Sequence, residues 1–145
     1  MTALADLPDR VILALLIWGE ARGEDVQGQI AVGNVVRNRL KRNVHPPAWK
    51  DICLAPFQFS CFNATDPNAG PIARAAVTLM TSALTPGLAQ AQWIADGVMS
   101  GACLDNVHGA THYLTTALLQ SHPPVWAVNQ PTVATIGAHT FLKVA

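Results

Sequence analysis

Two glutamates four residues apart, Glu20 and Glu24, are the first residues whose type and spacing suggest chemistry. They lie in "WGEARGED", directly after the apolar run Val11 to Trp18. Glu20 follows Leu16 by four residues and Ile12 by eight, which places it on the apolar side of the helix that this run predicts. Burial favours the protonated form of a carboxyl group, and a general acid must be protonated to act. Glu20 is therefore our candidate general acid.

The two glutamates are expected to differ because they sit at opposite ends of helices. An acid at a helix N-terminus, as we expect for Glu24, is stabilised by the helix dipole by about 0.3–1 kcal/mol and needs no chemical explanation. The dipole disfavours Glu20 in the last turn of its helix. The pattern leaves open that Glu20 reaches solvent or pairs with Arg22 or Arg37. Glu24 is the secondary acid candidate, unless Gly23 ends the first helix and separates the two side chains.

Two helices are predicted to position these carboxylates. The first has a cap at Asp6 and runs to about Ala21. The second begins at Glu24 or Asp25 and ends in the basic residues Arg37, Arg39, Lys41 and Arg42, which suit a helix C-terminus. We expect the apolar faces of these helices to pack together.

Leu16 and Val35 are predicted to be buried between these two helices. A proline-punctuated, loop-rich stretch follows over residues 43–71. Further helices are predicted in 72–84 and 86–101, and short β-branched strands in 110–116 and 134–144. The expected fold class is α+β, mainly helical, with a small sheet or hairpin near the C-terminus, in one domain over residues 1–145.

Composition excludes several classes of function. The chain has 145 residues, half of them apolar, and its nine basic and nine acidic residues cancel. This balance removes the usual electrostatic argument for a nucleic-acid partner or an anionic membrane surface. The apolar run near the N-terminus is too short for a membrane span and lacks a signal-peptide cleavage site. We expect a monomer with no nucleic-acid partner and no membrane insertion.

The three cysteines, Cys53, Cys61 and Cys103, are too few for a disulfide scaffold or a zinc knuckle. The sequence leaves two interpretations open. The cysteines are small buried residues, or Cys53 and Cys61 form a bridge across the loop.

Four segments in order resemble one protein family. The run "WGEARGEDVQGQIAVGNVVRNRL" resembles the signature of the SleB/CwlJ-type cell wall hydrolases, the spore cortex-lytic family, and "PFQFSCF", "GATHYLTT" and "IGAHTFLK" continue the likeness. The resemblance implies a lysozyme-like fold related to lytic transglycosylases and goose-type lysozymes. It also implies activity on the glycan strands of bacterial peptidoglycan, with Glu20 as the catalytic acid.

The family mechanism needs only one carboxyl group. In lytic transglycosylases a glutamate protonates the glycosidic oxygen and then takes a proton from the 6-hydroxyl of the muramic acid, which closes a 1,6-anhydro ring. The resemblance therefore implies a glycosidase that cuts the MurNAc–GlcNAc backbone without a cofactor. A hydrolytic muramidase that uses the same acid is the alternative.

Further polar and aromatic residues are predicted to bind substrate. In "PFQFSC" the side chains of the glutamine and serine can hydrogen-bond sugar hydroxyls, and Phe57, Phe59 and Phe62 are expected to pack beneath the loop. Strand alternation places the threonine and tyrosine of "ATHYLTT" on one face, and the family resemblance puts the tyrosine beside the acid. The predicted substrate-binding residues are Gln58, Ser60, Thr111, Tyr113 and Trp126, the last as a sugar-stacking platform.

A zinc amidase that cuts the peptide stem is a rival hypothesis. It would use the histidines near the C-terminus with an acid such as Asp105, but no HExxH or other compact metal spacing occurs in the sequence. We therefore expect no metal and no cofactor. The histidines in question are His108, His112, His122 and His139.

A catalytic domain without a recognisable leader or a separate wall-binding domain, as we expect here, resembles a phage endolysin. Such an enzyme acts in host cell lysis and stays in the cytoplasm of the producing cell until a holin releases it to the periplasm or wall. A bacterial or prophage origin remains the alternative.

Overall fold

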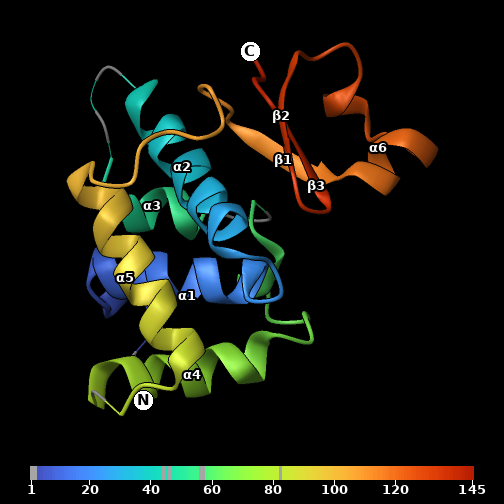
Figure 1. Cartoon of the computed structure of the whole chain (residues 1–145). Coiled ribbons are helices and arrows are strands. Elements are labelled where there is room, and N and C mark those ends of the chain that lie inside the picture. Colours follow the sequence, from blue (N-terminus) through green and yellow to red (C-terminus); the bar gives the residue numbers. More distant parts are fainter. Residues whose placement is uncertain (1–2, 44, 46, 56–57, 82) are drawn as a thin grey trace.

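The computed structural model describes residues 3–43, 45, 47–55, 58–81 and 83–145. Five helices form one part of the molecule, and a small sheet with a sixth helix forms the other (Figure 1). The five helices are α1 (Asp9–Ala21), α2 (Val26–Lys41), α3 (Trp49–Cys53), α4 (Ala69–Thr81) and α5 (Pro86–Ser100). The α+β, mainly helical fold class predicted from the sequence is confirmed.

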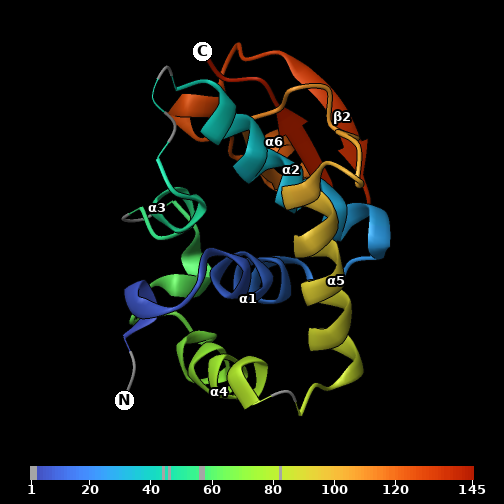
Figure 2. The same ribbon diagram turned by 90° about the vertical axis from the view of Figure 1, so that its left-hand side faces the viewer.

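Helix α1 lies at the centre of the helical part, and α2, α3, α4 and α5 all contact it (Figure 2). The reason is its composition, because every residue from Val11 to Ile17 is buried, and a helix that is apolar all round must be enclosed. It ends at Ala21, as predicted, but begins at Asp9 with Pro8 as its N-cap. The predicted cap, Asp6, belongs instead to a preceding 3-10 turn, η1 (Leu4–Asp6).

Helix α2 joins the two parts of the molecule. Asp25 is its N-cap, and the Asp25 carboxylate accepts a hydrogen bond from the backbone N–H of Gly28 at 3.0 Å. Its two apolar faces pack into two different hydrophobic clusters. Val32 and Val36 belong to the cluster around α1, whereas Val35 belongs to a second cluster with Phe141 of the sheet.

The prediction for Leu16 and Val35 is thus confirmed in burial, since both are 0% exposed. It is wrong about the packing of Val35. That side chain faces the sheet, because the third strand supplies an apolar surface that the helix-pairing argument did not include.

Helix α5 begins and ends as predicted, with Thr85 as its N-cap and Gly101 in the left-handed conformation at its C-cap. Helix α4 begins at Ala69, three residues before the predicted start at Ile72. Helix α3 and the sixth helix, α6 (Thr116–Ser121), were not predicted. They are five and six residues long, too short to show an apolar period.

The sheet contains β1 (His112–Thr115), β2 (Thr132–Ile136) and β3 (His139–Leu142), in the order β1-β3-β2 with antiparallel pairing. The segment predicted as one strand over 134–144 is therefore a hairpin that turns at Gly137. One face of the sheet packs on α2 through Phe141, and Tyr113 packs against the same cluster. The other face carries Leu114 and Leu142. Within the described ranges, no single helix is long and apolar enough to cross a membrane.

Candidate active site

Glu20 lies half-buried in the last turn of α1, where other segments supply hydrogen-bond donors to both of its carboxylate oxygens. The backbone N–H of Cys61 donates to Oε1 at 3.0 Å, and the phenol of Tyr113 donates to Oε2 at 3.1 Å. The hydroxyl of Ser60 lies 3.5 Å from Oε1 and makes a weaker contact. The carboxylate is therefore fixed by α1, by the 3-10 turn η2 (Ser60–Phe62) and by β1.

The alternative that Glu20 pairs with an arginine is wrong. Arg22 donates to the Asn68 side chain at 2.6 Å and lies over the Trp18 ring. Arg37 points to the backbone carbonyl of Cys103. Since its hydrogen-bond donors are all uncharged, Glu20 can change protonation state without breaking an ion pair.

Gly19 explains how η2 comes so close to α1. A Cβ atom at this position would lie 2.8 Å from Cβ of Cys61 and 2.9 Å from Cδ1 of Ile72. Either distance is shorter than two carbon atoms tolerate. The glycine before the glutamate thus allows the backbone N–H of Cys61 to reach the carboxylate.

Tyr113 is held rigidly by aromatic neighbours. Its ring lies 5.7 Å from that of Phe141 and 5.5 Å from that of His139, the latter edge to face. Burial, together with the negative charge of Glu20, raises the pKa of the phenol well above its ordinary value. Tyr113 therefore keeps its proton and remains a donor to Glu20.

Glu24 has a different environment from the one predicted. It belongs to neither helix, because α1 ends before Gly23 and α2 begins after Asp25. Its Oε1 lies 3.0 Å from Nδ1 of His139, rather than facing solvent or an arginine. The hairpin fits tightly there, because Gly137 has a φ of +56° and any Cβ on it would collide with Oε2 of Glu24. Glu24 thus anchors the β2–β3 hairpin to the α1–α2 junction.

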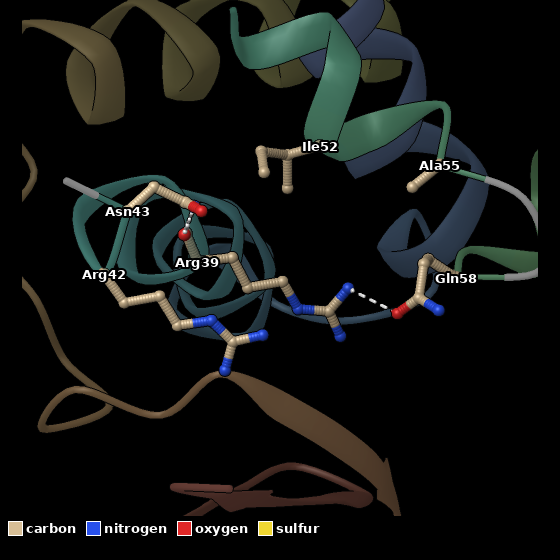
Figure 3. Close-up of a pocket in the computed structure, with 6 residues that line it drawn as sticks. All are labelled: Arg39, Arg42, Asn43, Ile52, Ala55 and Gln58. Carbon is tan, nitrogen blue, oxygen red and sulfur yellow. Dashed lines mark hydrogen bonds between the residues drawn. The ribbon is translucent and has the colours of Figure 1, made fainter. Parts of the chain in front are cut away.

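Gln58 lies beside the site but does not contact Glu20. Its Oε1 accepts a hydrogen bond at 3.2 Å from Nη1 of Arg39, which extends from α2 (Figure 3). Arg39 is only 7% exposed, donates through Nε to the carbonyl of Thr111, and lies over the ring of Phe59. Sequence reasoning missed Arg39 because the basic residues at the end of α2 were explained by the helix dipole alone.

Two predicted substrate-binding residues do not lie with the others. Thr111 is 5% exposed, and its hydroxyl is hydrogen-bonded to the backbone of Val144 and to His112, so it offers no free group to a sugar. Trp126 is 41% exposed and packs against His112, the neighbour of Tyr113 on β1. Side chains alternate along a strand. Trp126 therefore lies on the face of the sheet opposite Tyr113 and Glu20.

Of the three phenylalanines predicted to pack beneath the loop, Phe57 lies outside the described residues. Phe59 is 3% exposed and Phe62 packs against the main core, as predicted.

All three cysteines are free, and Cys53 and Cys61 are buried, in agreement with the first of the two interpretations. Burial raises the pKa of the Cys53 thiol to about 12. Burial and the nearby charge of Glu20 also raise the pKa of Cys61. Both thiols therefore stay protonated near neutral pH.

The residues of the zinc hypothesis are spread over separate structural roles. His139 pairs with Glu24, His112 packs on Trp126, and Asp105 accepts hydrogen bonds from the backbone N–H groups of Val107 and Gly109. In the part of the chain that the structure describes, no three His, Cys, Asp or Glu side chains converge in a way that could hold a metal ion.

Comparison with known proteins assigns the class. The family model described as Cell Wall Hydrolase matches residues 23–142, and the chain belongs to this family. The match begins after Glu20, so it rests on the rest of the chain and is independent of the proposed acid.

The particular relatives are spore cortex-lytic enzymes. The chain is 28% identical over 133 residues to the spore cortex-lytic enzyme of Halalkalibacterium halodurans. The aligned residues make up 92% of this chain and 34% of that enzyme. The chain thus spans about a third of the length of this relative.

Two solved structures share the fold. The catalytic domain of the germination-specific lytic transglycosylase SleB from Bacillus anthracis superimposes with a TM-score of 0.65 at 21% identity, covering 98% of this chain and 100% of that one. The catalytic domain of the Bacillus cereus SleB protein gives a TM-score of 0.64 at 25% identity, covering 93% of this chain and 89% of that one. The predicted lysozyme-like fold is confirmed.

Proposed function

We propose that this chain cleaves the MurNAc–GlcNAc backbone of bacterial peptidoglycan as a lytic transglycosylase, with Glu20 as its single acid and base. The observation that carries the proposal is the coordination of Glu20, whose two oxygens accept from Cys61 N–H and Tyr113 Oη and which has no cationic partner among the described residues. Membership of the cell wall hydrolase family supports the choice of substrate.

The first step is proton transfer to the glycosidic oxygen. Protonated Glu20 donates its proton as the bond to the muramic acid C1 breaks, and positive charge builds on that sugar ring. The carboxylate left behind accepts hydrogen bonds from Cys61 N–H and Tyr113 Oη. These donors are already in place, so the charge that develops on Glu20 is stabilised without rearrangement.

The second step uses the same residue as a base. The carboxylate removes the proton of the muramic acid 6-hydroxyl, whose oxygen attacks C1 and closes the 1,6-anhydro ring. Glu20 thereby regains its proton, and no water is consumed. This route needs no second carboxylate, and Glu24 is in contact with His139 instead.

The experiment is mass spectrometry of purified peptidoglycan after digestion, with Glu20→Gln protein as the blank. Anhydro-muramic ends are expected. Reducing ends would replace the transglycosylase by a muramidase with the same acid. Freed stem peptides, with loss of activity in excess chelator, would overturn the glycosidase in favour of a zinc amidase.

The biological role stays a prediction: an endolysin that accumulates in the cytoplasm and reaches the wall through a holin. Expression of the chain with and without a holin tests it. Lysis is expected only when both are present, and lysis by the chain alone would contradict the role.

A further inference from the structure

A second recognition site adjoins the active site. A hollow of about 230 Å³ lies between the end of α2, helix α3 and the loop that carries Gln58. We call it the arginine pocket. It is lined by Arg39, Arg42, Asn43, Ile52, Ala55 and Gln58. Figure 3 shows Arg39 and Arg42 extending from α2 in the same direction, with Gln58 facing Arg39.

The arginine pocket carries uncompensated positive charge. Among the described residues, no carboxylate lies within 4.0 Å of the guanidinium of Arg39 or of Arg42, since the only ion pairs there are Arg10–Asp96 and His139–Glu24. Burial lowers the pKa of Arg39, and the charge of Arg42 acts in the same direction. An arginine nonetheless stays charged near neutral pH. Two such charges close together favour an anion between them.

Arg39 is held in a buried position that its place at the end of α2 does not require. A basic residue at the end of α2 would satisfy the helix dipole from an exposed position, as Lys41 does. Arg39 is instead 93% buried, as its 7% exposure implies, and is fixed by Thr111 O and Gln58. The amide of Asn43 donates to the Arg39 carbonyl at 2.8 Å and closes the end of the helix. Arg42 is exposed and remains able to contact a ligand.

The arginine pocket is directly linked to the proposed acid. Gln58, on its rim, precedes by three residues Cys61, whose N–H binds Glu20. Three residues of chain reach at most about 10 Å. The ring of Phe59, between them, contacts both Arg39 and Tyr113. A sugar held at Glu20 can therefore place a side branch in the arginine pocket.

We propose that the arginine pocket binds a carboxylate of the stem peptide, the branch that muramic acid carries at its lactyl group. The site selects the muramic acid to be cut and fixes its register relative to Glu20. Arg42 makes the direct contact and Arg39 supports it from within. Charge-assisted arginine–carboxylate bonds are among the strongest polar contacts that proteins make. The net charge of the chain is zero, so this attraction is local. The assignment rests on the proposed glycan-cleaving function.

The test compares Arg42→Gln with Lys41→Gln. Both variants remove one positive charge from the end of α2, but Lys41 does not line the arginine pocket. Three substrates are digested: native peptidoglycan, peptidoglycan whose carboxyl groups are coupled to methylamine, and strands freed of stems by an amidase, which bear only lactyl carboxylates. The readout is kcat/KM for the release of glycan ends. Thermal unfolding of each variant checks that the fold is intact.

On native substrate, Arg42→Gln is expected to lose about 10-fold or more in kcat/KM, while Lys41→Gln stays near the wild type. Neutralised substrate should reduce the wild type to the level of Arg42→Gln and leave that variant unchanged. Arg42-dependence confined to native substrate assigns a carboxylate of the stem. Dependence that also appears on stem-free strands means that the lactyl carboxylate, which the amidase frees, is accepted in its place.

Equal rates for Arg42→Gln and wild type on native substrate would overturn the proposal. So would an equal loss in both proteins on neutralised substrate, because the carboxylates would then act elsewhere. Absence of any glycan cleavage by the wild type is a different result, which removes the proposed function itself.

Discussion

Glu20 and Glu24 are the same residue type, four positions apart, and the structure gives them opposite environments. Glu20 is surrounded by uncharged donors from a loop and a distant strand. Glu24 is bound to the imidazole of His139 and holds a hairpin in place. The partner of Glu24 is a basic side chain, whereas the donors to Glu20 are a backbone N–H and a phenol. The partners of a carboxylate, more than its position along the chain, decide whether it is suited to move protons or to hold structure.

The largest expected effect comes from Glu20→Gln. The variant should lose about 100-fold to 10,000-fold in glycan cleavage, the contribution typical of a general acid. It should stay folded, since the new amide oxygen can still accept from Cys61 N–H, and it should still sediment with peptidoglycan. Turnover on purified peptidoglycan and thermal unfolding measure both properties. If Glu24→Gln were the inactive protein and Glu20→Gln the active one, the comparison would be reversed.

Tyr113→Phe tests the donors of Glu20 separately from the acid. Loss of one positioned hydrogen bond at a reacting centre should reduce kcat by about 10-fold to 1000-fold with little effect on stability. The ring contacts with Phe141 and His139 are retained in the variant. Unchanged kcat would show that the phenol does not support the acid.

Glu24→Gln is expected to lower stability more than activity. The His139 contact is largely shielded from solvent, so its loss should reduce the free energy of unfolding by about 1–2 kcal/mol. Turnover should fall by less than about 10-fold, because the residue takes no proton-transfer step in the proposed mechanism. Chemical denaturation of Glu24→Gln, His139→Gln and the double variant gives the coupling between the two residues. Additive losses would mean that they do not act as a pair.

The smallest expected effect concerns His112, which lies beside Tyr113 but on the other face of β1. Burial, with the positive charges of Arg39 and Arg42, lowers the pKa of His112 to about 4. The unfolded chain binds this proton near its ordinary pKa of about 6.5, so stability is complete above that pH and falls as the pH drops from about 6.5 to about 4.

His112→Gln should remove part of this acid sensitivity, and His122→Gln, at an exposed position, is the control. Thermal unfolding over this pH range measures the difference. Identical pH profiles for the wild type and His112→Gln would contradict the assignment.

The sequence predicted those parts of the fold that local signals determine. The ends of α5 carry Thr85, Pro86 and Gly101, each of which favours a helix boundary on its own. Helix α1 was predicted from its unbroken apolar run. Helices α3 and α6 are a turn or two long and depend on packing with distant segments, so no local pattern could reveal them.

The same distinction applies to the candidate site. Glu20 was predicted because an acid on the apolar side of a helix is visible in the sequence and because the family resemblance aligns the catalytic acid with it. The backbone N–H of Cys61 was not, because every residue except proline carries such a group and only the fold selects one. Arg39 was hidden among neighbouring basic residues. Trp126 was predicted to be a sugar-stacking platform because the sequence does not show that its helical turn packs against the face of the sheet opposite Tyr113.

The bond between Tyr113 and Glu20 joins residues that are 93 positions apart, and the Cys61 contact spans 41. Contacts between such distant residues form late in folding, because long loops must close first. During synthesis the segment with Glu20 leaves the ribosome well before the strand with Tyr113. A partly made or truncated chain that ends before β1 therefore lacks the Tyr113 donor and the strand that carries it. The donors of the proposed acid are complete only after translation has passed β1 and the strand has docked.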